Sequence, residues 1–396
     1  MPFLTPVHFM SSAWLLPEHI ADVLPAEARR IEELRRQWLD LARSYGFEMV
    51  MPPLLEHLDS LLSGTGRELD LKTFKLVDQL SGRTLGLRAD TTPQVARIDA
   101  HLLNREGVTR LCYCGPVLHT RPAGPHATRE PLQFGVEIFG HGGLEADLEV
   151  QELALGGLQA AGVPGLMLDL GDARILRSVL GGVALDAMAL NDLVAAMTAK
   201  DRGAVLDMTR GCNAETRSAL EAMLELYGGA EVLQLAHDRL PARPEIRAAL
   251  ADLAWLAGHL GQAYPGLRIG FDLSDMSGYA YYSGLRFSVY GSGSSKVLAR
   301  GGRYDDVGAV FGRNRPAVGC SLDLKGLSAV AADLPHTAVV RAPWGEDAGL
   351  RKAIRALRAS GQSVVCMLPG HEQTVQEFDV DRELCEVEGQ WVMRPI

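Results

Sequence analysis

The stretch Gly115–Gly140 reads GPVLHTRPAGPHATREPLQFGVEIFG. An apolar run ends near Leu118, a polar loop rich in Gly and Pro follows, and a second apolar run extends from Leu132 to Phe139. This pattern predicts two strands joined by a long loop. Gln133 and Glu137 are four residues apart on the second strand, so their side chains are expected on the same face of a sheet.

The flanking sequence carries further alternating helix and strand signals. Apolar residues spaced by three and four predict a helix over 26–45, and Gly46 is suited to end it. Helices are also expected from Thr91 or Thr92 onward and over 145–161. Extended segments are expected at 47–56, at 73–90 with a turn at Ser81-Gly82, and at 165–172, 267–275, 281–291 and 296–306. Residues 317–331 are expected to pass from a strand into a helix.

The strands cluster, and one block between them is different in composition. Residues 173–262 are rich in Ala and Leu with few strand signals, which predicts a helical insertion. The expected organisation is a first core part over 1–172, the insertion, a second core part over 263–332, and a small α/β extension over 333–396. Clustered strands separated by hairpins favour an α+β fold on an antiparallel sheet. The glycine-rich run 291–296 is expected to be a hairpin turn, because it lacks the features of a phosphate-binding loop.

The charge and the cysteine content indicate in which cellular compartment the protein acts and which partners it does not bind. The formal net charge of −10 argues against non-specific binding to nucleic acid or to a membrane surface. None of the six cysteines forms a CxxC pair, so a metal site is not expected. The first residues lack the features of a signal peptide, and no apolar run is long enough to span a membrane. We therefore expect a cytoplasmic protein in a reducing compartment.

Five segments occur together in the order that is typical of one enzyme family. They are LRADTTPQVAR at 87–97, the 115–140 hairpin, SGYAYYSG at 277–284, GGRYDD at 301–306 and PAVGCSLDLKGL at 316–327. The chain resembles the core of a class II histidyl-tRNA synthetase over roughly residues 5–330. The resemblance implies an antiparallel sheet with flanking helices and a dimer formed through the segment around Pro52-Pro53.

The resemblance also shows which groups have changed at the positions that hold ATP. The family places arginines where this chain has His119, Ser277 and Gly326, and Arg121 stands where an acidic residue reads adenine. A guanidinium binds phosphate bidentately and is always charged, so it is difficult to replace. The nearby cations Arg121, Arg129 and Lys325 either compensate or are ordinary surface charges.

In contrast, the positions that hold histidine in the family are largely kept. Carboxylates suit an α-ammonium group, whereas Gln and Tyr can bond an imidazole. Glu137 and Asp90, which is shorter than the usual Glu, are expected to hold the ammonium, and the tyrosines with Gln133 the ring. The expected histidine-binding set is Asp90, Thr92, Gln133, Glu137, Tyr281, Tyr282 and Tyr304. No catalytic residue, cofactor or metal is expected.

The chain has thus lost the arginines that bind ATP phosphates but keeps the residues that bind histidine. In this it resembles a second family, the regulatory subunits of ATP phosphoribosyltransferase. In that family a synthetase-like subunit assembles with a short catalytic subunit, commonly as a hetero-octamer. It is needed for efficient catalysis of the first step of histidine biosynthesis and transmits feedback inhibition by histidine. Two alternatives stay open: a synthetase-like enzyme with a rearranged ATP site, and a free histidine-binding protein.

Overall fold

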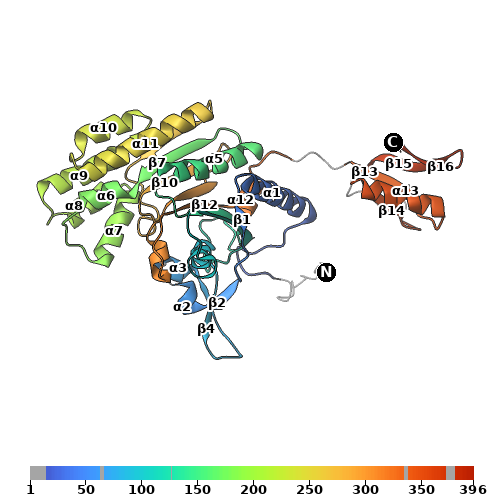
Figure 1. Ribbon diagram of the computed structural model, residues 1–396, viewed down its shortest axis with the longest axis horizontal. Coiled ribbons are helices and arrows are strands. Elements are labelled where there is room, and N and C mark those ends of the chain that lie inside the picture. Colours follow the sequence, from blue (N-terminus) through green and yellow to red (C-terminus); the bar gives the residue numbers. More distant parts are fainter. Residues whose placement is uncertain (1–14, 63–66, 126, 334–337, 372–379) are drawn as a thin grey trace, which may run out of the picture. The chain divides into compact units, whose positions relative to one another are not determined.

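The computed structural model in Figure 1 describes residues 15–62, 67–125, 127–333, 338–371 and 380–396. Residues 1–14, most of the N-terminal segment 1–19 that lacks signal-peptide features, lie outside the described residues. Contacts divide the chain into two compact units, Met1–Ala332 and Asp333–Ile396. Each unit is described by itself. In the described part of the chain, no helix is both long enough and apolar enough to cross a membrane.

The first unit is built on a nine-stranded sheet of order β1-β5-β6-β12-β11-β10-β7-β9-β8. The strands are β1 (Glu48–Met49), β5 (Thr109–Pro116), β6 (Leu132–Phe139), β12 (Ala317–Asp323), β11 (Ala299–Arg303), β10 (Leu285–Tyr290), β7 (Met167–Asp172), β9 (Arg268–Asp272) and β8 (Tyr227–Gly228). β5 and β6 pair antiparallel, which confirms the predicted hairpin. The turn predicted at 291–296 likewise connects the antiparallel strands β10 and β11.

The prediction of a purely antiparallel sheet was wrong at two places. β1 pairs parallel with β5, and β7 pairs parallel with β9. Parallel neighbours need a long crossover connection. For β7 and β9 this connection is the helical block between them, whose length and composition were visible in the sequence although its role as a crossover was not.

Helices α1 (Pro25–Ser44), α5 (Leu144–Ala160) and α12 (Leu324–Ser328) pack against the central strands (Figure 1). α1 buries Ile31, Leu34 and Trp38 on one face, as its apolar spacing predicted. The Trp38 ring lies 5.2 Å from the Phe134 ring on β6. A Cβ at Gly157 of α5 would collide with the Trp38 indole, so a glycine is needed there for the two helices to meet.

Six helices form the block between β7 and β9. They are α6 (Ala173–Val179), α7 (Ala187–Thr198), α8 (Arg202–Met208), α9 (Ala214–Glu225), α10 (Glu231–Arg239) and α11 (Pro244–Ala263). Side chains of Asp172, Asp186, Asp201 and Asn213 accept hydrogen bonds from first-turn N–H groups and so cap four of these helices. Their buried leucines continue the core of the nine-stranded sheet without a break.

A small antiparallel sheet of order β2-β4-β3 precedes the central hairpin, with β2 (Leu55–His57), β3 (Phe74–Val77) and β4 (Thr84–Leu87). Short helices α2 (Leu58–Leu61) and α3 (Arg67–Lys72) lie between β2 and β3. The helix expected after residue 91 is present as α4 (Thr92–Arg97), which continues as a wider π-helical turn, η2 (Ile98–Leu103). Thr91 precedes the helix, but its side chain makes no capping hydrogen bond.

The second unit is a four-stranded sheet of order β14-β13-β15-β16 with one helix. Its elements are β13 (Val339–Pro343), α13 (Ala348–Ala359), β14 (Ser363–Met367), β15 (Val380–Val387) and β16 (Gln390–Pro395). Val340, Leu350, Ile354 and Leu384 are buried in its core. The first three elements match the α/β pattern of the sequence, whereas the antiparallel pair β15–β16 was not predicted.

Candidate functional site

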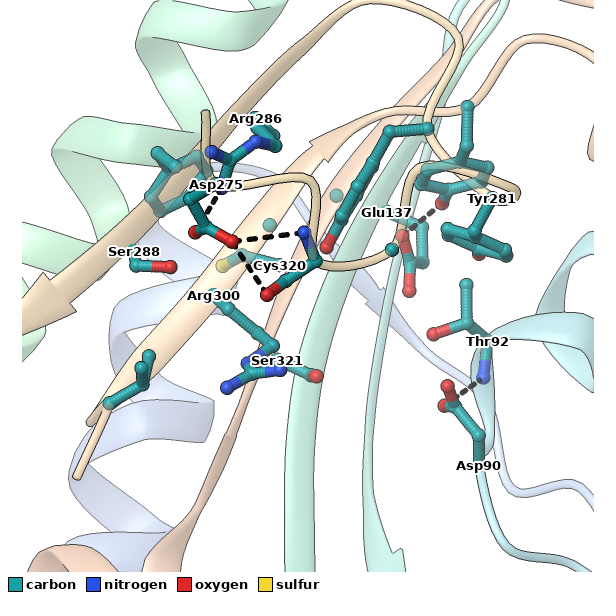
Figure 2. A pocket seen from close by; sticks show the side chains of 18 of the residues that line it. Asp90, Thr92, Glu137, Asp275, Tyr281, Arg286, Ser288, Arg300, Cys320 and Ser321 are labelled. Atoms are coloured by element: carbon teal, nitrogen blue, oxygen red, sulfur yellow. Dashed lines mark hydrogen bonds and ion pairs between the residues drawn. The ribbon is translucent and has the colours of Figure 1, made fainter. Parts of the chain in front are cut away.

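A cavity of about 380 Å³ opens on one face of the nine-stranded sheet (Figure 2). Its walls come from β6, β10, β11 and β12, from the loop 275–282, and from the segment that enters α4. The volume falls in the range of small-ligand sites. Six of the seven residues predicted to bind histidine line it: Asp90, Thr92, Glu137, Tyr281, Tyr282 and Tyr304.

Glycines in the sheet make room for two charged side chains of the cavity. Gly319 on β12 is paired with Glu137 on β6, and a Cβ at Gly319 would collide with the Glu137 carboxylate. Gly171 on β7 is paired with Arg286 on β10, and a Cβ there would lie 2.8 Å from its guanidinium Nη2. At both positions an absent side chain leaves space for a charged neighbour.

Glu137 lies at the bottom of the cavity with only 1% of its surface exposed. The Tyr113 hydroxyl donates to its Oε1 at 3.1 Å, and the Tyr304 hydroxyl donates to its Oε2. Burial disfavours the charged carboxylate and raises the pKa of Glu137 to about 8, although the phenol hydrogen bonds oppose this shift. The group is therefore mostly protonated at neutral pH.

Asp90 is held differently. Its Oδ1 accepts hydrogen bonds from the Thr92 N–H at 3.0 Å and from the Gln133 side-chain amide at 2.9 Å. Its Oδ2 makes no hydrogen bond with any residue that the structure describes, so it is available to a ligand. The carbonyl oxygen of Gln133 accepts from the Thr91 N–H at 3.0 Å. Gln133 therefore orients Asp90 and is not among the cavity-lining residues, unlike the other six.

The tyrosines form one side of the cavity. The Tyr281 ring lies 5.0 Å from the Tyr304 ring and 5.5 Å from the Tyr282 ring. The Tyr281 hydroxyl is buried and has no hydrogen-bond partner in the described part of the chain. A buried hydroxyl without a partner is costly. A ligand with a donor or acceptor at this point would satisfy it.

The structure adds a polar region that the sequence analysis missed. Arg286 is 5% exposed and pairs with Asp275 at 2.7 Å, while Arg300 lines the cavity from β11 (Figure 2). The alternation of Arg286, Ser288 and Tyr290 along β10 was a usable signal, because alternate residues share a face of a strand. Arg300 and Asp275 had no such local pattern, and only strand pairing brings them to the cavity.

The three positions that have lost an arginine provide no cation to the cavity. The His119 ring nitrogen Nε2 lies 2.9 Å from the Ala89 carbonyl oxygen, and burial lowers the pKa of His119, which favours the neutral ring. The Ser277 hydroxyl donates to Asp275 at 2.7 Å, and Gly326 has no side chain.

Nearby cations are engaged elsewhere. Lys325 pairs with Glu130 at 3.1 Å. The Arg129 guanidinium lies 5.1 Å from the Phe74 ring and donates to the His119 carbonyl oxygen at 3.0 Å. Arg121 is exposed. None of these three side chains lines the cavity, so the cavity does not use them in place of the lost arginines.

Both units of this chain match families of known proteins. Residues 19–327 match the family described as histidyl-tRNA synthetase, and residues 337–394 match the C-terminal domain of ATP phosphoribosyltransferase subunit HisZ. The ATP phosphoribosyltransferase regulatory subunit of Variovorax paradoxus (strain S110) is 62% identical over 97% of this chain and all of its own length.

Solved structures agree with this grouping. An ATP phosphoribosyltransferase regulatory subunit/histidyl-tRNA synthetase from Bacillus halodurans is 27% identical, with a TM-score of 0.77 over 92% of this chain and 94% of that one. A chain of the ATP phosphoribosyl transferase (HisG:HisZ) complex from Thermotoga maritima, 18% identical, has the same fold with a TM-score of 0.57 over 76% of this chain and 98% of that one. The predicted α+β class II synthetase-like fold is confirmed. The chain belongs to the family of ATP phosphoribosyltransferase regulatory subunits.

Proposed function

We propose that this chain is the non-catalytic regulatory subunit of an ATP phosphoribosyltransferase and that it transmits feedback inhibition by histidine. The observation that carries the proposal is the composition of the cavity. The side chains suited to an amino acid line it together, whereas the three arginine positions of the ATP site hold His119, Ser277 and Gly326. Without those cations, charge on a reacting phosphate lacks the stabilisation that arginines supply at these three positions in the synthetase family.

The groups that lack partners support a position for histidine in the cavity. The free Oδ2 of Asp90 accepts from the α-ammonium. The imidazole lies between Glu137 and the unpartnered Tyr281 hydroxyl, with one ring nitrogen toward each. This arrangement differs from the one expected from the sequence, in which both carboxylates shared the ammonium. Burial raises the pKa of Glu137 to about 8, and a protonated carboxyl suits a ring nitrogen better than an ammonium.

The proposed partner is the short catalytic subunit of ATP phosphoribosyltransferase. The Thermotoga maritima complex contains a chain of the same fold together with HisG. We propose self-association through the segment around Pro52-Pro53 and a hetero-octameric complex that acts in the cytoplasm, without tRNA and without a membrane.

The test combines the purified chain with the catalytic subunit. Turnover should rise on mixing, and the two proteins should elute together in size-exclusion chromatography. Histidine should inhibit the complex. Glu137→Ala should weaken inhibition about ten- to a hundredfold. This factor corresponds to the loss of a hydrogen bond to a charged group, which contributes roughly 1.5–3 kcal/mol. Activation in the absence of histidine should persist, and the surface variant Glu245→Ala should behave like the wild type.

The outcomes separate the parts of the proposal. Separate elution with unchanged turnover would reject the regulatory role. Lost binding in the cavity with unchanged inhibition would place the regulatory histidine at another site in the complex.

A further inference from the structure

Three polar side chains form a row across adjacent strands at one side of the cavity. Arg300 on β11 is paired directly with Ser288 on β10 and with Ser321 on β12. Directly paired residues project from the same face, with Cα atoms about 4.5–5.5 Å apart. All three line the cavity (Figure 2). The sheet therefore presents a guanidinium with a hydroxyl on each side.

These three groups have no partner within the described chain. The Arg300 guanidinium makes no hydrogen bond or ion pair there, and neither do the side-chain hydroxyls of Ser288 and Ser321. Arg286, the other arginine of the cavity, is different because Asp275 neutralises it at 2.7 Å. A guanidinium has five N–H donors in a planar fork that matches two oxygens of an oxyanion. The row is thus a set of donors without an acceptor.

We propose that the row Ser288–Arg300–Ser321 is the receptor for the α-carboxylate of the amino acid that the cavity binds. The proposal rests on the proposed function, since it assumes that the ligand is histidine. A carboxylate and a phosphate share the oxyanion chemistry that the row recognises. The carboxylate is favoured because the cavity has only one unpaired guanidinium among its described residues and also contains the Asp90 carboxylate, which would repel a polyanion.

The spacing across the sheet fits one histidine. Glu137 is paired with Gly319, Gly319 with Gly302, and Arg300 is two residues from Gly302 along β11. Two strand spacings and two residue rises place the Cα atoms of Glu137 and Arg300 about 12 Å apart. Bond lengths give histidine a span of roughly 6 Å from carboxylate to far ring nitrogen. With a hydrogen bond of about 2.9 Å at each end, the total is about 12 Å, which equals the Cα spacing when the two side chains stand parallel on the face that they share.

The test compares ligands with and without a carboxylate on the full chain by titration calorimetry. L-histidinol keeps the ring and the ammonium but has a hydroxymethyl group in place of the carboxylate. The wild type should bind histidine about ten- to a hundredfold more tightly than histidinol. Arg300→Gln should remove that difference by weakening histidine alone. Arg300→Lys, which keeps the charge but not the fork, should lie between them.

The control is Arg217→Gln, an exposed arginine on α9 outside the cavity, which should leave both affinities unchanged. Equal loss for both ligands, or no loss in Arg300→Gln, would overturn the proposal. If the wild type binds no histidine, the proposed function fails first. Titration with inorganic phosphate then decides on the row: binding that is lost in Arg300→Gln supports an oxyanion site but overturns the carboxylate assignment, and absence of binding overturns both.

Discussion

The carboxyl of Glu137 shares its surroundings with two phenols, and its raised pKa of about 8 has a consequence for histidine binding. A free imidazole titrates near 6.5. We assume that Glu137 and the imidazole share one proton in the complex. Before binding, the protein carboxyl and the ligand ring hold one proton between them only from about pH 6.5 to pH 8; below that range they hold two and above it none. Affinity should therefore be greatest in that window, and it should fall by up to tenfold per pH unit on either side.

We predict that Glu137→Gln removes the alkaline decrease and keeps the acidic one, because an amide does not titrate. Calorimetry of histidine binding from pH 5.5 to pH 9 on both proteins checks this. The α-ammonium of the ligand loses its proton equally in the two experiments, so the difference between them isolates Glu137. An identical alkaline decrease in both proteins would show that Glu137 does not share a proton with the ring.

We also predict that the purified chain lacks histidine-dependent pyrophosphate exchange. Removing a single preorganised donor costs roughly 2.7–4 kcal/mol in a transition state, and three arginine positions are empty of cations here. Exchange should stay below about one hundredth of the rate of an ordinary synthetase, since 1.4 kcal/mol corresponds to tenfold in rate. A rate above that limit would restore the enzyme alternative.

Some residues of the cavity could be predicted from the sequence, and others could not. Asp90, Thr92, Glu137 and the tyrosines belong to recognisable motifs, so their meeting in one cavity was predictable. Arg300 carried no local signal. Its place depends on which strands are neighbours and in which register, and those facts arise from long-range pairing.

At the scale of elements, the loop 275–282 is held by the helical block. Arg177 on α6 donates to the carbonyl oxygens of Tyr279 at 3.1 Å and Tyr282 at 2.6 Å, and its guanidinium lies 5.0 Å from the Tyr279 ring. Arg177 is not among the residues that we assign to histidine binding, but these contacts fix the path of the chain through Tyr281. The helical block is in this way connected to the cavity.

We predict that Arg177→Met weakens histidine binding about five- to thirtyfold, as expected for the loss of one or two ordinary hydrogen bonds. Amides in residues 278–284 should also exchange with solvent faster. Calorimetry and hydrogen exchange by mass spectrometry test both effects. Arg239→Met, which removes a surface pair on α10, is the matched control. Unchanged exchange in Arg177→Met would mean that the loop holds its shape alone.

Local sequence signals located most elements, and the exceptions share a cause. The apolar spacing of α1 and the alternation of β10 are properties of short windows, so they were visible. The parallel pairing of β1 with β5 is a relation between distant segments. The π-helical turn η2 had no signal in the sequence that set it apart from the α-helix before it.

At the scale of the whole molecule, every residue that lines the cavity belongs to the first unit. The second unit has its own buried core around Val340, Leu350 and Leu384. A ligand of the cavity therefore stabilises the first unit directly.

We predict two unfolding transitions in calorimetric scans of the full chain, of which histidine shifts only the larger. At a hundred times its dissociation constant, histidine should add about 2.7 kcal/mol to the first unit and raise its midpoint by a few degrees. Histidinol at the same concentration, being weaker, should shift it less. Equal shifts of both transitions would show that the two units unfold as one.

The glycines beneath the cavity lead to an expectation in genetic terms. A bacterium selected for growth on a toxic histidine analogue gains by losing feedback inhibition while it keeps the complex. At Gly171, a single base change to alanine adds one methyl group at 2.8 Å from the Arg286 guanidinium. The resistant strains should therefore include alleles that leave every ligand-contacting residue intact and only displace the Arg286 side chain.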